Sequence, residues 1–327
     1  MSRDHRKRRT RRLVRLLALL PMSRRIKIER WLRGRDEVER LREADTVIVS
    51  FGKSGRTWLR VMLSRYYQLI DGIPASALLD GTNYHELNSE IPTIAFSHDN
   101  YVSDYTGEHD SRRFFYQKKV VLLVRNPKDV AVSLFFQWQH RMLPSKIRLN
   151  GYPPRDSEIT PFDFVMLPNR GLPRIIGFMN LWARESSKVE QILIVRYEDM
   201  RTDTAATLRR ILSFADRRPV DVGAVDEAVA YASVENMRKL EETGVFTESG
   251  GHMRPGKVGD PDSYKVRRAK VGGYADYFSA EERARIDALV RETLSPQFGY
   301  EVGAGASDPA APGPLARVDA GDSSEAG

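Results

Sequence analysis

The sequence predicts one α/β domain with a mostly parallel central sheet flanked by helices. Four short apolar runs, rich in β-branched residues, have the character of strands buried on both faces; they span 46–51, 93–98, 120–125 and 192–197. Helical patterns, with apolar residues three and four apart, follow three of these runs at 56–70, 127–141 and 204–215. This repetition of strand, tight turn and helix predicts right-handed crossovers and a ligand site at the carboxyl ends of the strands.

Composition sets the domain limits and the expected compartment. We expect the central domain over 45–302, between a basic N-terminal arm (1–44) and a disordered tail (303–327) of Gly, Ala, Pro, Ser and Asp. Of the 327 residues 41% are hydrophobic, which is enough for a sizeable core. The absence of cysteine excludes disulfides, thiolate metal sites and a cysteine nucleophile, and it fits a cytoplasmic location.

Positive charge is concentrated in the arm. Residues 1–35 contain fourteen Lys/Arg and two acids, a net +12, and the whole chain has +8, so residues 36–327 carry −4. The body is therefore not expected to bind nucleic acid specifically. The apolar run 13–20 is shorter than the roughly 18 residues that span a bilayer. Two interpretations stay open: an arm lying on the anionic inner face of the membrane, or a solvated arm whose apolar residues pack on the body.

The first strand-to-helix turn, 50–59 (SFGKSGRTWL), has the composition of a phosphate cradle. Gly52 and Gly55 let backbone amides converge on an anion, the helix N-terminus adds partial positive charge, and Lys53 adds a full charge. It is not a Walker A loop, because that motif requires a glycine where Val47 stands. An ordinary glycine turn with a surface lysine is the alternative.

The second turn, 123–136 (LVRNPKDVAVSLFF), predicts another anion site. Arg125 leaves a buried strand, Pro127 suits the first helical position, and Ser133 lies about two turns into the helix. A guanidinium at a strand end beside a helix start suits a second phosphate. The alternative is a surface pair between Arg125 and Asp129 with a routine helix serine.

These turns, together with "VRYEDM" (195–200) and "VRRAKVGGYADYFS" (266–279), resemble the nucleotide-binding motifs of the sulfotransferases that use 3′-phosphoadenosine 5′-phosphosulfate (PAPS). The four motifs occur in the family's order. The resemblance implies a P-loop-like α/β fold and PAPS as co-substrate, without a metal.

The resemblance also implies residue roles. The 5′-phosphosulfate would be held by Lys53, Ser54, Gly55 and Thr57, and Trp58 would lie against the adenine. The 3′-phosphate would be bound by Arg125 and Ser133, with Arg267 and Arg268 closing over it. Tyr197 would contact the purine, helped by segment 232–237, which includes Ser233. His98 takes the position of the family's base.

The chain departs from the family pattern at several places. Arg56 stands where a small residue is usual, which predicts an added contact to the sulfonate or to an acidic acceptor. Ala269 replaces a glycine in the C-terminal motif, and 253–260 competes weakly with 267–279 for that role. Around His98 only a preceding hydroxyl, Ser97, keeps the usual context.

The sequence therefore predicts in-line transfer of a sulfonate group from PAPS to an acceptor hydroxyl, or less favourably an amine. His98, with an ordinary pKa of about 6.5, is the expected base, and Lys53 faces the bridging oxygen. Other possibilities are a nucleotide-dependent kinase and a non-catalytic protein that binds membrane or nucleic acid through its arm. We expect 142–175 to be a loop that walls the acceptor site; it does not distinguish lipid, sugar, phenol and peptide acceptors, and the oligomeric state stays open.

Overall fold

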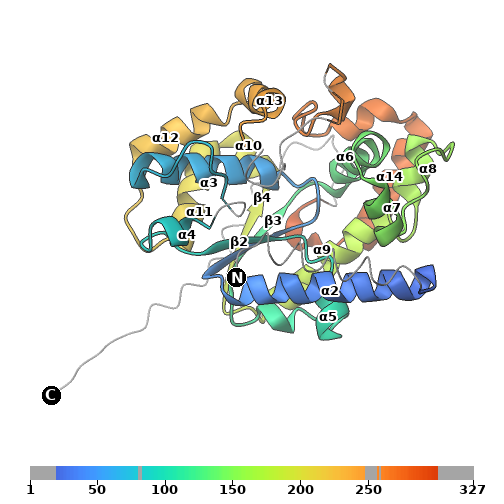
Figure 1. Cartoon of the computed structure of the whole chain (residues 1–327). Coiled ribbons are helices and arrows are strands. Elements are labelled where there is room, and N and C mark those ends of the chain that lie inside the picture. Colours follow the sequence, from blue (N-terminus) through green and yellow to red (C-terminus); the bar gives the residue numbers. More distant parts are fainter. Residues whose placement is uncertain (1–19, 80–82, 247–255, 258, 301–327) are drawn as a thin grey trace.

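The computed structural model describes residues 20–79, 83–246, 256–257 and 259–300 (Figure 1). Its four described strands are β1 (Thr46–Ser50), β2 (Ile94–Ser97), β3 (Lys119–Val124) and β4 (Gln191–Arg196). They form one sheet in the order β2-β1-β3-β4, and every neighbouring pair is parallel. The predicted α/β fold with a parallel sheet is confirmed. The predicted tail (303–327) lies outside the described residues.

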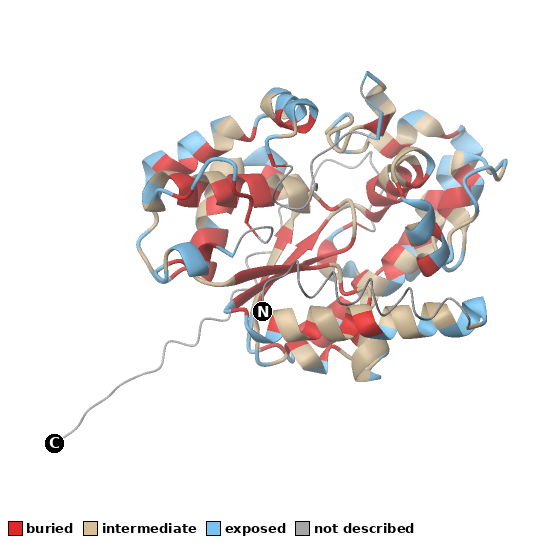
Figure 2. Cartoon of the chain, viewed as in Figure 1, coloured by how far each residue is buried: buried red, intermediate tan, exposed pale blue. Residues whose placement is uncertain are grey.

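Alternation along the strands divides the interior into two cores, one on each face of the sheet. Val47 and Val49 belong to the first core, and Ile48 between them belongs to the second. On β3, Val120 and Leu122 face the first core in the same way. Figure 2 shows buried residues along β1, β2 and β3 and on the inward faces of the helices. On β4, at an edge of the sheet, buried residues alternate with half-buried ones after an exposed first residue. Burial on both faces explains why these strands are continuous apolar runs rather than alternating ones.

The helices predicted after three strands are present as α3 (Arg56–Asp71), α6 (Pro127–His140) and α11 (Thr204–Ala215). Local sequence sets their limits. The Asn126 side chain accepts from the Lys128 amide at 3.1 Å, and Pro127 occupies the first helical position. Gly72 ends α3 in the left-handed region, with φ 64°.

The helices lie in two groups on either side of the strand ends (Figure 1). One group contains α3, α11, α12 (Val222–Tyr231) and α13 (Val234–Thr243). The other contains α6, α8 (Pro161–Met166), α9 (Leu172–Ser186) and α14 (Ala280–Thr293). The remaining short elements are α4 (Tyr84–Leu87), α5 (Val102–Thr106), η2 (Arg113–Phe115), α7 (Pro144–Asn150), α10 (Tyr197–Thr202), η3 (Pro261–Ser263), η4 (Gly273–Tyr277) and η5 (Pro296–Phe298).

Part of the predicted arm is folded onto the body as α2 (Met22–Arg42). Leu32, Val38 and Leu41 are buried, and Arg30 pairs with Asp104 of α5 at 2.8 Å. These apolar residues of α2 thus pack on the domain, whereas Met22 and Trp31 are exposed. Residues 1–19 lie outside the described residues.

The expectation that 142–175 is a loop is wrong. This stretch contains α7, α8 and the first turn of α9. Pro144 and Pro161 begin α7 and α8 rather than interrupting them, because a proline at the first helical position loses no helical hydrogen bond.

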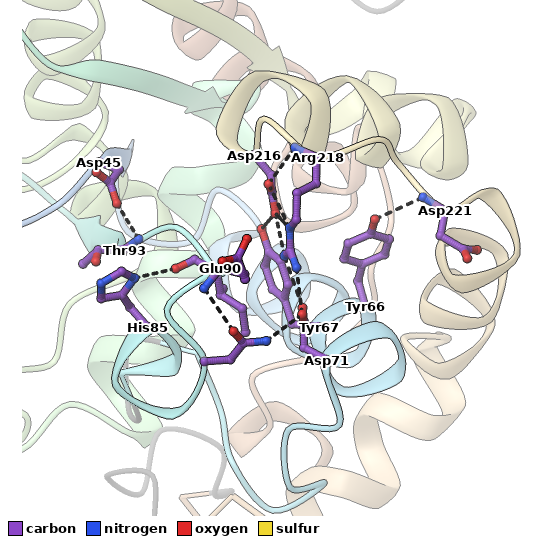
Figure 3. Close-up of polar contacts among 12 residues, drawn as sticks. Asp45, Tyr66, Tyr67, Asp71, His85, Glu90, Thr93, Asp216, Arg218 and Asp221 are labelled. Carbon is purple, nitrogen blue, oxygen red and sulfur yellow. Dashed lines mark hydrogen bonds and ion pairs between the residues drawn. The ribbon is translucent and has the colours of Figure 1, made fainter.

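A polar cluster fixes the C-terminal end of α3, which is the end far from the turn between β1 and α3 (Figure 3). Arg218 pairs with Asp71 of α3 at 2.7 Å and with Asp216, which follows α11, at 2.9 Å. The Tyr67 hydroxyl donates to Asp216 at 3.2 Å. Because Tyr67 and both carboxylates are buried, the cluster holds α3 rigidly against α11.

Candidate active site

The turn between β1 and α3 is built around two residues with positive φ, Lys53 (75°) and Gly55 (90°). Gly55 caps α3, and a Cβ atom there would lie 2.5 Å from Cδ2 of Tyr197. Both the backbone conformation and this close approach therefore require glycine. The turn directs the helix N-terminus and the Lys53 side chain into one cavity.

Lys53 is poorly solvated and surrounded by like charge. Burial, followed by the nearby charges of Arg141, Arg125 and Arg267, lowers its pKa from 10.5 to about 7, against a smaller opposing effect of Glu241. An ammonium group placed so unfavourably is expected at a site that binds an anion.

Arg125 occupies the neighbouring strand end, as predicted. Its guanidinium donates to the backbone oxygens of Lys53 at 3.2 Å and Lys270 at 3.4 Å, and it lies 4.3 Å from the centre of the Tyr197 ring. The pair with Asp129 is present at 3.8 Å, but it is not a surface pair, because Asp129 is buried. Arg125 thus connects the two predicted anion sites.

Asp129 instead positions the C-terminal motif. Its carboxylate accepts from the Gly272 amide at 2.8 Å and from the Tyr274 amide at 2.9 Å. These bonds hold the motif over α6, where residues 267–270 line the cavity. Of the competing stretch 253–260, the part that the structure describes does not line it. Ala269 adopts φ 51°, so the backbone keeps the conformation that favours glycine.

Two arginines of this motif face the cavity from its rim. Arg267 stacks on Phe136, 3.9 Å from the ring centre, and donates to the Tyr277 hydroxyl. Arg268 donates to the same hydroxyl at 3.1 Å and pairs with Asp276 at 3.0 Å. These contacts preposition both guanidinium groups.

An aromatic corner lies beside the cradle. The Trp58 indole donates to the Ala232 oxygen at 2.8 Å, and its ring centre is 6.0 Å from that of Tyr197. Arg201 lies over the Trp58 ring at 5.5 Å. Trp58, Tyr197, Thr57 and Ser133 all line the cavity, as their predicted roles require.

Two predicted residues lie outside the cavity lining. Ser54 is buried beneath the turn. Ser233 is exposed, and its hydroxyl accepts from the Asn236 amide at 3.3 Å as the cap of α13, while its neighbours Ala232 and Val234 line the cavity.

His98 follows β2 and has a defined tautomer. Its Nδ1 faces the Ser50 oxygen at 2.9 Å; since a carbonyl only accepts, Nδ1 carries the proton. Nε2 therefore has a lone pair, which accepts from the Arg56 guanidinium at 2.5 Å. Burial and then the Arg56 charge lower the His98 pKa well below 6.5. The expectation of an ordinary imidazole pKa is wrong, because its environment disfavours the imidazolium.

The cavity has a volume of about 640 Å³ and a strongly cationic lining. Among the described residues that line it, two are acidic, Glu37 and Asp129, and thirteen are cationic: Arg40, Lys53, Arg56, Arg60, Arg125, Arg141, Lys146, Arg174, Arg201, Lys265, Arg267, Arg268 and Lys270. A chain whose residues 36–327 sum to −4 thus gathers cations in one place.

Sequence reasoning missed most of these cations. Arg141 pairs at 3.1 Å with Glu241, which is fully buried and also accepts from the Lys265 amide at 2.8 Å. Arg40 and Glu37 come from α2, a segment whose charge suggested only an arm. One sequence feature could have indicated a buried cation nearby: Glu241 is an acid on the otherwise apolar face of a helix.

The comparisons with known proteins identify the class. Residues 43–297 match the family defined by the sulfotransferase domain, so the chain belongs to this family and the predicted resemblance is confirmed.

Individual relatives are distant. The chain is 24% identical over 279 residues to cytosolic sulfotransferase 8 of Arabidopsis thaliana, a match that covers 77% of each protein. It is 24% identical over 273 residues to flavonol 3-sulfotransferase of Flaveria bidentis, which covers 76% of this chain and 81% of the relative. A crystal structure of mouse sulfotransferase SULT7A1 complexed with PAP shares 21% identity and a TM-score of 0.49, over 77% of this chain and 84% of that chain.

The described part of the chain contains neither a metal-binding group nor a membrane-spanning helix. Over those residues, no group of three or more His, Cys, Asp or Glu side chains is arranged to hold a metal ion. Within the same ranges, no helix has the length and hydropathy needed to cross a bilayer.

Proposed function

We propose that this protein transfers a sulfonate group from PAPS to an acceptor hydroxyl. The observation that carries the proposal is the position of Lys53: a poorly solvated ammonium that lines the cavity from a strained turn, with Arg125 bonded to its backbone oxygen and His98 just after the adjacent strand. The cationic cavity fits a donor that carries roughly four negative charges at neutral pH.

The proposed donor contacts follow from the cavity lining. The 5′-phosphosulfate lies on the turn 53–57, where Lys53, Arg56 and the helix N-terminus meet. The 3′-phosphate lies between Arg125, Ser133 and the rim arginines Arg267 and Arg268. The adenine packs in the corner of Trp58 and Tyr197.

The proposed reaction is an in-line displacement at sulfur. The acceptor hydroxyl gives its proton to Nε2 of His98 while its oxygen forms the new S–O bond. The bond from sulfur to the bridging phosphate oxygen breaks, and that oxygen takes the electron pair next to the Lys53 ammonium. The products are the sulfate ester, adenosine 3′,5′-bisphosphate and the proton on His98, which passes to solvent.

The contact between Arg56 and His98 must break before the reaction can take place. It donates to the same Nε2 lone pair that the acceptor hydroxyl needs. We propose that the sulfonate of the bound donor attracts the Arg56 guanidinium, which frees His98 and places a cation on the equatorial oxygens.

The other functions are less well supported. Membership of the sulfotransferase family favours neither a kinase nor a non-catalytic binding protein. A cytoplasmic location is consistent with the relatives that are named cytosolic sulfotransferases. Association of residues 1–19 with an anionic membrane face is a separate prediction, tested below.

Nucleotide choice tests the proposal. Adenosine 3′,5′-bisphosphate at 100 times its Kd is expected to stabilise the protein by about 2.7 kcal/mol, while ATP with magnesium gives a much smaller shift in Tm. Equal stabilisation by both nucleotides, or by neither, would contradict the assignment of a 3′-phosphate site.

A further inference from the structure

The cavity contains more cationic side chains than the donor requires. The donor contacts proposed above use Lys53, Arg56, Arg125, Arg267 and Arg268. Two further cations, Lys146 of α7 and Arg174 of α9, line the same cavity from the group of helices that faces α3 across the strand ends (Figure 1).

In the described part of the chain, no carboxylate forms an ion pair with Lys146 or Arg174, although the charges of Glu29 and Glu37 act on Lys146 from a distance. The Lys146 ammonium has one neutral polar contact, the Tyr101 hydroxyl at 3.5 Å, and Tyr101 itself donates to Asn150 at 3.1 Å. Nearby acids are engaged elsewhere: Glu29 pairs with Arg33 at 2.6 Å, and Glu37 accepts from Ser97 at 2.5 Å.

Lys146 lies on the His98 side of the cavity. Its charge contributes to the lowering of the His98 pKa. Its own pKa falls to about 8, because burial and then the Arg33 charge outweigh the opposing charges of Glu29 and Glu37. An ammonium that is partly desolvated, has no carboxylate in direct contact and lies near the base is placed to contact the acceptor.

Arg174 approaches the same region from α9. One helical turn further along α9, Phe178 packs edge-on against Phe51, which follows β1, and their ring centres are 5.5 Å apart. This face of α9 is therefore directed to the reacting centre. The cavity lining also includes Met142, Leu143 and Tyr152. The lining therefore combines two cations that have no direct ion pair with an apolar and aromatic surface.

We propose that the acceptor is a hydroxyl compound with an apolar or aromatic body and an anionic group, a phosphate or a carboxylate, which Lys146 and Arg174 bind. This inference rests on the proposed function, since it assumes that the donor occupies the other cations. The anion fixes the acceptor so that its hydroxyl reaches Nε2 of His98.

The test uses protein saturated with adenosine 3′,5′-bisphosphate, which occupies the two phosphate sites. Because this nucleotide has no sulfonate for Arg56, the variants below decide where an added anion binds. Calorimetry at fixed ionic strength measures the Kd of phenyl phosphate, phenylacetate and the neutral 4-ethylphenol. At least one anion is expected to bind about tenfold or more tightly than the neutral compound. The anion that binds more tightly shows whether the anionic group of the acceptor is a phosphate or a carboxylate.

Variants locate the contact. Lys146→Met and Arg174→Met are each expected to weaken binding of the preferred anion about tenfold to a hundredfold, with 4-ethylphenol changed less than about twofold. The control is Lys239→Met, which removes the same charge from an exposed lysine of α13 paired with Glu235; it should leave every Kd unchanged.

Three results would overturn the inference: no anion binding to the saturated protein, a neutral ligand as tight as both anions, or an equal loss for all three ligands in Lys146→Met. Failure of the proposed function has a different signature. In that case adenosine 3′,5′-bisphosphate does not bind the wild-type protein at all.

Discussion

Raising the pH from 7 to 9 tests the Lys53 site directly. In the nucleotide-free protein the pKa of Lys53 is about 7, because of burial and neighbouring cations, so about one molecule in eleven keeps the ammonium at pH 8. Bound phosphates neutralise those cations and return the pKa towards its ordinary 10.5. Binding of adenosine 3′,5′-bisphosphate therefore takes up a proton, and its Kd rises about fivefold from pH 7 to pH 8 and about ninefold from pH 8 to pH 9.

Calorimetry in buffers of different ionisation enthalpy measures this uptake. We expect about 0.9 protons per nucleotide from Lys53 at pH 8, and a Kd about fiftyfold higher at pH 9 than at pH 7. In Lys53→Met the uptake should fall by the same amount. Uptake near zero in the wild type, or uptake unchanged by Lys53→Met, would refute the account of the site.

The remaining predictions concern other residues. Arg125→Ala should weaken binding of adenosine 3′,5′-bisphosphate tenfold to a hundredfold yet leave adenosine 5′-phosphosulfate nearly unaffected; an equal loss for both would place Arg125 elsewhere. His98→Ala should lower kcat about 10² to 10⁴-fold with little change in nucleotide Kd, and because the His98 pKa is lowered well below 6.5, wild-type kcat/KM should show no acid limb near pH 6.5. Gly55→Ala forces a Cβ to 2.5 Å from Tyr197 and should cost about 1–3 kcal/mol of stability, measured by denaturant unfolding, together with nucleotide binding; a neutral effect would contradict the geometry of the turn. Deleting residues 1–19, which leaves α2 intact, should abolish salt-sensitive binding to anionic vesicles but not nucleotide binding; equal vesicle binding with and without them would exclude that role.

The free energy of unfolding should also depend on the protonation of Lys53, and it should rise with pH. Its native pKa lies below its unfolded value, so between pH 7 and 10.5 the unfolded chain binds more protons and stability of the nucleotide-free protein rises with pH. Lys53→Met should therefore melt higher than the wild type at pH 7, and the difference should shrink towards pH 10. A lower Tm at pH 7 would mean that the ammonium stabilises the empty site.

The strands and their helices were predictable because local and tertiary preferences agree. Buried parallel strands are continuous apolar runs, and Asn126 with Pro127 marks a helix start in any context. The cradle was predictable for the same reason, since Gly55 has both a conformational and a packing role.

The cationic wall was not predictable, because its members come from distant segments. Lysine and arginine usually lie at the surface, so nothing local distinguishes Lys146 or Lys265 from solvated residues. The His98 pKa likewise depends on Arg56, which approaches only when β1 and β2 pair. The prolines of 142–175 indicated a loop, although each of two begins a helix.

Transfer of radiolabelled sulfonate from PAPS tests the central claim most directly. Wild-type protein, Lys53→Met and His98→Ala are incubated with labelled PAPS and a fractionated cell extract, and the label in each fraction is compared with the adenosine 3′,5′-bisphosphate released. We predict equal amounts of ester and nucleotide product in one fraction with the wild type, and at least about a hundredfold less with either variant. Wild-type protein that binds PAPS but labels no fraction, or a Lys53→Met variant that labels the same fraction equally well, would contradict the account.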